Sequence, residues 1–163
     1  MIQKYIDSTF APEKDRVLGA LAHVNQPYLQ MRTLDFAISG KVRKQDIMRL
    51  ISSVAVYSPM GHMYTWNWLR SNWKTIMHLW KGLDYSHLNG VIQTVTSRFI
   101  QPVLVQEAED LFLYRKDPDF FIPPRAPIAV AKGLEIAKQR IEWLRLYEKD
   151  VESWLVNEES EST

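Results

Sequence analysis

The side chains of this chain that are best suited to bind a metal are its four histidines, His23, His62, His78 and His87. A zinc site on a helix typically pairs two histidines four residues apart, with a glutamate beside the first. None of the four has a histidine at that spacing, and the chain contains no cysteine. Isolated histidines on amphipathic helices are usually surface or partly buried residues. We therefore expect no metal site and no cofactor in this chain.

Motifs for other kinds of catalysis are also missing from the sequence. The six glycines form no Gly-x-Ser-x-Gly turn, no phosphate-binding loop and no dinucleotide-binding fingerprint. No catalytic residue is therefore assigned, and the chain alone is not expected to be an enzyme.

One charged segment, Arg43-Lys44-Gln45-Asp46, has the right chemistry to hold a ligand. An arginine presents a bidentate fork to a carboxylate or phosphate, so Arg43 and Lys44 are candidates for substrate binding. The plainer interpretation is that Gln45 or Asp46 caps the next helix while the two basic side chains lie in solvent.

The tryptophans between Ser58 and Lys81 are a second candidate binding surface, because tryptophan is common at interaction sites. Trp66, Trp73 and Trp80 are spaced by seven residues, and Trp68 lies on the other side of the predicted helix. Core packing is the plainer interpretation for Trp66 and Trp73. A helix that is bulky on two faces is expected to lie between two neighbours.

Prolines and hydrophobic periodicity predict the elements that position these residues. Pro12, Pro27, Pro59 and Pro102 each precede a helical apolar pattern, and Gly40 and Gly82 are placed to end helices. The patterns predict three helical hairpins, then a proline-rich loop over residues 117–127 with Phe120 and Phe121 as either a contact knob or a core plug. A long closing helix follows, bent near Tyr147.

The predicted fold is therefore all-α, an irregular superhelix of antiparallel HEAT/ARM-like helical hairpins. We assign residues 1–157 to one helical domain and residues 158–163 to a disordered acidic tail. The net charge of +1 gives no general attraction to nucleic acid, and no apolar run is long enough to span a membrane. The lack of cysteine and of a signal peptide favours the cytoplasm, although localisation stays open.

The family resemblance rests on residues spread over nearly the whole chain. The central motif is Gly61, Trp66, Trp68, Leu69, Arg70, Asn72 and Trp73. It is preceded by Ala20-Leu21-Ala22, Pro27, Arg32, Leu34, Val42, Arg43, Gln45 and Asp46, and followed by Phe99, Glu107, Phe112, Ile141-Glu142-Trp143-Leu144, Trp154 and Leu155. In this order the residues resemble the C-terminal helical domain of the zinc aminopeptidases of the aminopeptidase N, puromycin-sensitive and endoplasmic-reticulum aminopeptidase group. The chain departs from that group at Trp68, where phenylalanine is usual, and in its longer proline-rich loop.

This resemblance implies a noncatalytic fragment of a larger enzyme that removes N-terminal residues from peptides. In that family the zinc-binding His-Glu-x-x-His motif and the Gly-x-Met-Glu-Asn stretch belong to an upstream catalytic domain, so zinc is expected there. The helical domain is a bowl that closes over the catalytic cleft and limits access to short peptides. The implied partners are the upstream catalytic domain and a peptide substrate.

A second hypothesis is a free-standing HEAT-like scaffold that binds a partner protein through its concave face. An in-frame upstream region encoding His-Glu-x-x-His would support the first hypothesis, and a genuine start at Met1 would support the second. If the chain is a fragment, we expect an exposed apolar patch on the side formed by Met1 to Val24, and self-association there.

Overall fold

The computed structural model describes residues 1–58, 60–82, 84–117 and 120–161, with the side chains of 158–161 excluded. Within these ranges the chain is helical and contains no strand, which confirms the predicted all-α class. The elements are α1 (Ile2–Asp7), α2 (Ala11–Ala22), α3 (Pro27–Ala37), α4 (Lys44–Tyr57), α5 (Gly61–Leu79), α6 (Ser86–Thr96), α7 (Pro102–Glu109), the π-helix η1 (Asp110–Tyr114) and α8 (Ala126–Glu161).

Proline and glycine set several of the helix ends. Pro12, Pro27 and Pro102 occupy the first or second position of α2, α3 and α7, where the missing N–H has no intrahelical partner to lose. Gly40 and Gly82 follow α3 and α5 with φ of 79° and 78°, a left-handed conformation that costs glycine little. Pro59 lies outside the described residues.

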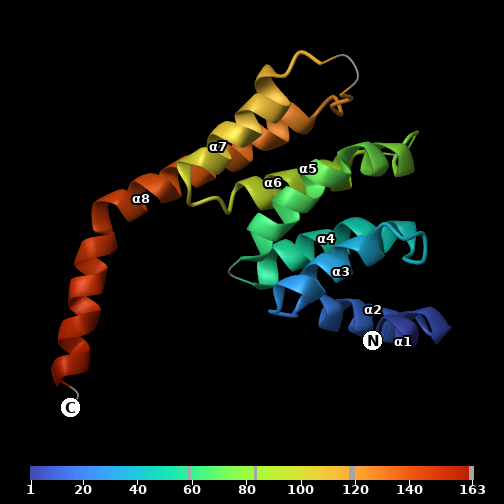
Figure 1. Ribbon diagram of the computed structural model, residues 1–163, viewed down its shortest axis with the longest axis horizontal. Helices are drawn as coiled ribbons and strands as arrows, with labels where there is room; N and C mark the ends of the chain where they lie inside the picture. Colours follow the sequence, from blue (N-terminus) through green and yellow to red (C-terminus); the bar gives the residue numbers. More distant parts are fainter. Residues whose placement is uncertain (59, 83, 118–119, 162–163) are drawn as a thin grey trace.

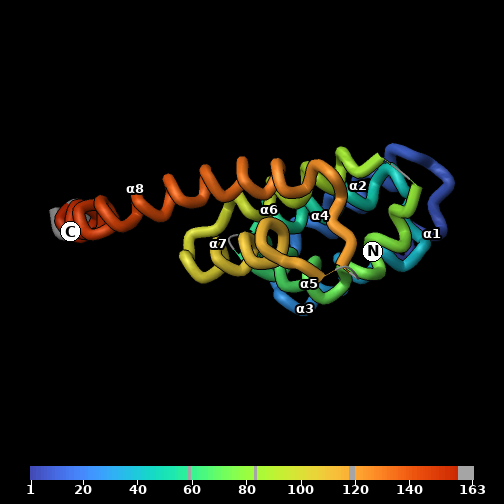
Figure 2. Tube along the Cα trace, turned by 90° about the horizontal axis from the view of Figure 1, so that it is seen from above, coloured from blue at the N-terminus to red at the C-terminus, as the bar shows by residue number. Residues whose placement is uncertain are grey.

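The helices form two layers (Figures 1 and 2). In one layer α2, α4, α6 and α8 pack in succession, and in the other α3 packs against α5. Side chains of α5 continue that second layer to α7, because the Trp66 indole N–H donates to Glu107. The stack therefore alternates between layers along the chain; whether it is of HEAT type remains a prediction.

Helix α5 lies at the centre of the stack and is buried on two faces. Trp66 and Trp68 are both 1% exposed and Trp73 is 2% exposed. On one face the ring of Trp66 meets Phe99 edge-on, with centroids 5.4 Å apart, and Trp73 meets Phe112 in the same way at 5.1 Å. The tryptophans predicted to fill the core do so, and Trp68 faces the other neighbour as the spacing predicts.

Two glycines allow close approaches between helices. A Cβ built on Gly61 would lie 2.0 Å from the carbonyl oxygen of Val54, and one on Gly133 would lie 2.0 Å from Oγ1 of Thr96. The first contact brings α5 against α4, and the second brings α8 against α6. At both positions a larger residue would push the packed helices apart.

The proline-rich loop carries a core plug. Phe120 stacks on Trp73, with ring centroids 5.7 Å apart and planes 17° from parallel, and it is partly buried against the core. The indole N–H of Trp73 donates to the carbonyl of Phe121 at 2.9 Å. Of the two interpretations of this loop, the structure supports the plug for Phe120.

Helix α8 extends beyond the stack and bends there (Figure 1). Its buried residues include Leu134 and Ala137, whereas Trp143 and Trp154 are 51% and 58% exposed. The backbone of α8 continues to Glu161, while Ser162 and Thr163 lie outside the described residues. The predicted disorder of the tail 158–163 thus stays a prediction.

Candidate functional site

Arg43, the first sequence candidate for ligand binding, is used inside the fold. Its guanidinium donates to Asp46, which is 4% exposed, and to Asp15 of α2 at 2.6 Å. Its backbone N–H donates to the hydroxyl of Tyr5 at 3.2 Å. The hydrogen bond to Asp46 raises the pKa of Arg43. The geometry therefore assigns Arg43 a role in joining α1, α2 and α4.

Arg49 completes the same cluster. It donates to Asp15 at 2.8 Å and to Asp46 at 3.0 Å, so two arginines share two carboxylates. The hydrogen bond from Arg49, helped by its charge and that of Arg43, lowers the pKa of Asp15. The predicted side-chain cap does not form, because no side chain caps α4 and Asp46 accepts from arginines.

Lys44, the second candidate, is exposed at the start of α4, and no hydrogen bond or ion pair joins its ammonium to a described residue. It borders a hollow of about 210 Å³ between α4 and α6. That hollow adjoins a second of about 390 Å³, which shares Gln45, Met48 and His87 with it. Together they form one groove, which we call the α4–α6 groove.

The charges along the α4–α6 groove are mostly basic. Lys44 and Arg49 lie on the α4 side, and His87 lies on α6. The carboxylate in the lining, Asp84, accepts from the hydroxyl and the backbone N–H of Ser86, and these bonds lower its pKa. Lys44 is therefore the charge in the groove that is free to meet an anionic group such as a carboxylate.

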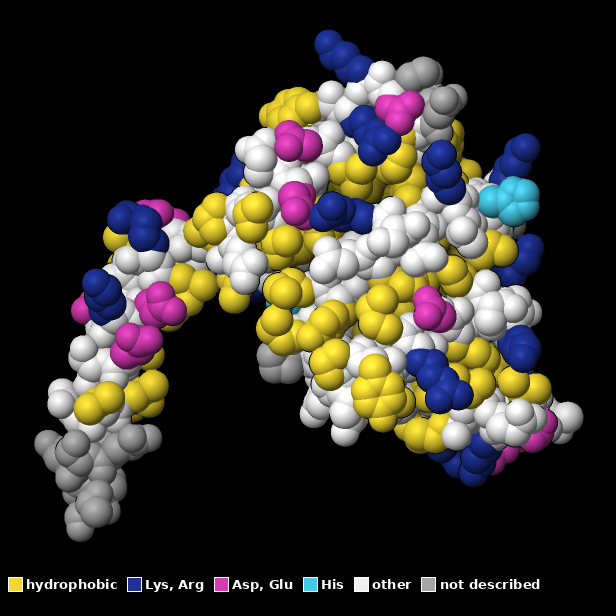
Figure 3. All heavy atoms as spheres, in the orientation of Figure 1, with side chains coloured by type: hydrophobic (Ala, Val, Ile, Leu, Met, Phe, Trp, Pro, Cys, Tyr) yellow, Lys and Arg dark blue, Asp and Glu magenta, His cyan; other side chains and the backbone are white. Residues whose placement is uncertain are grey.

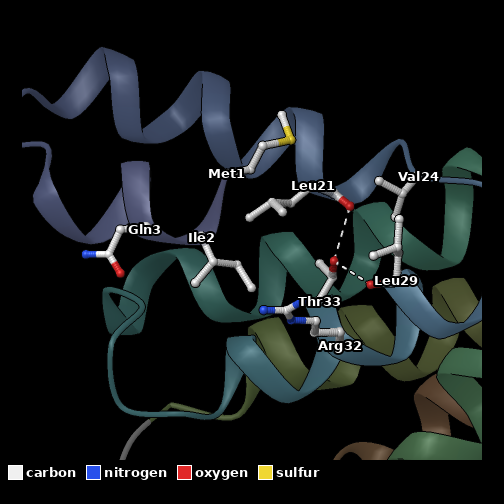
Figure 4. Close-up of a pocket in the computed structure, with 8 residues that line it drawn as sticks. All are labelled: Met1, Ile2, Gln3, Leu21, Val24, Leu29, Arg32 and Thr33. Carbon is white, nitrogen blue, oxygen red and sulfur yellow. Dashed lines mark hydrogen bonds between the residues drawn. The ribbon is translucent and has the colours of Figure 1, made fainter.

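A separate hollow, of about 340 Å³, lies at the α1 end of the stack (Figure 4). Figure 4 shows Leu21, Val24 and Leu29 on one side and Ile2 on the other. Arg32 lies at its edge, and its guanidinium has no hydrogen-bonded partner among the described residues. This hollow can accept an apolar side chain. Met1 and Phe10, on either side of α1, are 64% and 60% exposed, and a continuous apolar patch in this region stays a prediction.

The motif residues of α5 make contacts within the fold. The N–H groups of Trp66, Trp68 and Trp73 donate to Glu107, Asp35 and the Phe121 carbonyl, so each tryptophan ties α5 to a different neighbour. Asn72 donates to the carbonyl of Trp68 within α5 at 3.0 Å. The sequence spacing identified these tryptophans but contained no signal for their polar partners.

No group of three histidine, aspartate or glutamate side chains that could hold a metal ion is found among the described residues. His23 stacks on Tyr57 with ring centroids 3.7 Å apart, and His62 is 7% exposed in the core. No helix in the described part of the chain is long and apolar enough to span a membrane. The arrangement around Lys44 and the groove can bind a ligand.

Comparison with known proteins identifies the family. The chain matches the model of the ERAP1-like C-terminal domain over residues 1–138. It is 29% identical over 160 residues to glutamyl aminopeptidase of Bitis rhinoceros, covering 98% of this chain and 16% of that protein. It is 32% identical over 143 residues to aminopeptidase N of Bos taurus, covering 87% of this chain and 14% of that protein.

Aminopeptidase Ey of Gallus gallus is 26% identical over 161 residues, with 98% of this chain and 16% of that protein covered. The chain thus spans about a sixth of the length of the curated relatives that it matches. Because the family match covers most of its residues, the chain belongs to the ERAP1-like C-terminal domain family of aminopeptidase proteins.

Proposed function

We propose that this chain is the noncatalytic C-terminal domain of a zinc-dependent aminopeptidase that removes N-terminal residues from peptides, and that it helps to enclose the substrate. The observation that carries the proposal is the match along nearly the whole chain to aminopeptidases about six times as long. The proposed partners are the upstream catalytic domain and the peptide.

In such an enzyme a zinc ion bound in the catalytic domain would polarise the scissile carbonyl and activate water. The residues of this chain would contribute binding and exclusion of solvent. Lys44 is the proposed contact for an anionic group of the peptide, because its ammonium is exposed beside the α4–α6 groove and has no hydrogen bond or ion pair with a described residue. Arg43 is a weaker proposal, since its guanidinium already binds Asp15 and Asp46.

Two measurements test the domain assignment. The sequence encoded in frame upstream should contain His-Glu-x-x-His, and the purified 163-residue chain should neither hydrolyse aminoacyl fluorogenic substrates nor bind zinc stoichiometrically. Chelator-sensitive turnover by the chain alone would overturn the assignment. A genuine start at Met1 would instead favour a free-standing helical scaffold, which the exposed apolar residues of the chain also suit.

Substitution of Lys44 in the longer enzyme tests the role of the groove. Lys44→Ala should raise KM several-fold for acidic peptides and leave the hydrolysis of single aminoacyl fluorophores unchanged, since only peptides reach a distant contact. Lys132→Ala removes another exposed lysine, on α8, and is the matched control. Equal effects of the two substitutions would exclude Lys44 as a specific contact.

A further inference from the structure

Helix α8 leaves the stack with its apolar side chains uncovered. Arg140 donates to the Ser97 carbonyl at 3.0 Å, and Ile141 still packs partly against the core. From residue 142 to residue 157, a segment that we call the arm, α8 packs against no other element in the views of Figures 1 and 2. Its exposed large apolar residues include Trp143 (51%), Tyr147 (48%), Val151 (41%), Trp154 (58%) and Leu155 (50%).

These five residues form one stripe, the arm stripe. The five residues follow one another along α8 at intervals of four, four, three and one positions, so they lie within about a third of the helix circumference. Glu148 and Asp150 flank the stripe on its two sides, and neither carboxylate has an ion-pair partner among the described residues. By contrast, Glu142 is paired with Arg145 at 2.7 Å. The arm stripe is thus an apolar ridge with acidic edges.

A second group of exposed apolar side chains lies at one end of the stack. The α4–α5 and α6–α7 connections lie at the end of the stack from which the arm emerges (Figure 1). These connections and the helix ends beside them carry four exposed apolar residues, which we call the turn-end surface: Tyr57 (50% exposed), Met60 (44%), Ile100 (46%) and Val103 (59%). Figure 3 shows hydrophobic side chains along this edge of the stack and on the arm, with open space between them. A segment in that space would contact apolar side chains on two sides.

The exposed area is large enough for a stable contact. A large aromatic side chain buries about 150–250 Å², so the nine half-exposed side chains of the two surfaces leave on the order of 1,000 Å² open to water. A typical stable interface buries about 800 Å² on each partner.

The charges argue against a second arm as the occupant. Pairing two arms along their stripes would bring Glu148 and Asp150 of one copy beside the same carboxylates of the other, which is unfavourable. The relatives favour an occupant in the same polypeptide. Their alignments cover 98% of this chain, so they extend into the arm, in proteins about six times as long.

We propose that the space between the arm stripe and the turn-end surface holds a helical segment from another part of the longer aminopeptidase polypeptide. This proposal rests on the proposed function. The segment is apolar on two sides and carries lysine or arginine opposite Glu148 and Asp150. The arm therefore acts as a clasp that joins the helical stack to the rest of the enzyme.

Hydrogen–deuterium exchange of the arm amides tests the clasp in two proteins, the 163-residue chain and the longer polypeptide encoded in frame with it. We expect exchange at least tenfold slower in the longer polypeptide. Trp154→Glu should return the exchange to the rate in the 163-residue chain. Val156→Glu is the matched control, because Val156 is 62% exposed and lies on the opposite side of the helix.

Charge reversal gives an independent readout. Asp150→Lys should speed exchange of the arm several-fold in the longer polypeptide, most strongly at low salt, whereas Glu152→Lys, away from the stripe, should not. Equal exchange in the two proteins, or equal effects of Trp154→Glu and Val156→Glu, would overturn the clasp. Protection that appears in the 163-residue chain only at high concentration would also overturn it, in favour of a second copy. Absence of any longer polypeptide would instead overturn the proposed function.

Discussion

Replacing Gly61 with alanine tests the contact between α4 and α5 on which the centre of the stack depends. The added Cβ would lie 2.0 Å from the carbonyl oxygen of Val54 and 3.1 Å from its carbonyl carbon. Both are backbone atoms of a buried helix, so no side-chain rotation can relieve the overlap. Overpacking of this kind costs about 1–3 kcal/mol and sometimes more. Alanine recovers up to about 1 kcal/mol relative to glycine in a helix.

We therefore expect Gly61→Ala to lower the free energy of unfolding by about 2 kcal/mol, the upper part of the overpacking range less the gain in helix propensity. For a domain of this size, that loss corresponds to a fall in the thermal unfolding midpoint, Tm, of roughly 4–8 °C. Urea unfolding followed by helical circular dichroism measures the difference. Gly19→Ala in α2 is the control, because its Cβ meets nothing within 4 Å, and it should be neutral or stabilising. If Gly61→Ala is as stable as Gly19→Ala, the close approach of α4 and α5 is wrong.

Two further predictions concern polar contacts. Trp68→Phe removes the N–H that donates to Asp35 at 2.8 Å and shrinks a side chain that is 1% exposed, so urea unfolding should show a free energy of unfolding lower by about 1–3 kcal/mol. The control Trp143→Phe, on the exposed part of α8, should change the free energy of unfolding by less than about 0.5 kcal/mol. Equal losses in the two variants would contradict the buried position of Trp68. The lowered pKa of Asp15 means that its ion pairs stabilise the fold above the usual carboxyl pKa and are lost as pH falls through the lowered value. In thermal unfolding at a series of pH values, Asp15→Asn should melt below wild type at neutral pH, with the difference vanishing in strong acid; a constant difference would refute this.

The sequence predicted the elements of the fold better than it predicted their long-range partners. Proline and glycine act on their own backbone, so Pro27, Pro102, Gly40 and Gly82 could be assigned from local chemistry. The seven-residue spacing of Trp66 and Trp73 fixes a common face, and any helix in a stack must bury such a face. These features need no knowledge of which helix lies opposite.

The role of Arg43 depends on residues far along the chain. Asp15 is 28 positions away, and nothing in the sequence near Arg43 indicates that the two side chains meet. The segment around Arg43 therefore predicted either ligand binding or solvent exposure for this side chain, and it did not predict the ion-pair cluster. The same limit applies to α8, in which the periodic apolar pattern continues past Ile141, the last residue of α8 that packs partly against the core. Periodicity shows which face is apolar and cannot show what covers it.

The three indole hydrogen bonds of α5 have a mechanical consequence. Trp68 donates a hydrogen bond to α3, while Trp66 and Trp73 donate to α7 and to the loop before α8. Sliding of either neighbour along α5 would therefore break a partly buried hydrogen bond. The central helices should therefore move as one stiff block. Bending of the stack should be confined to connections away from these bonds, such as the one containing Gly40. A motion that opens or closes the structure would therefore be a hinge rotation at such a connection, with the central helices moving as a rigid body.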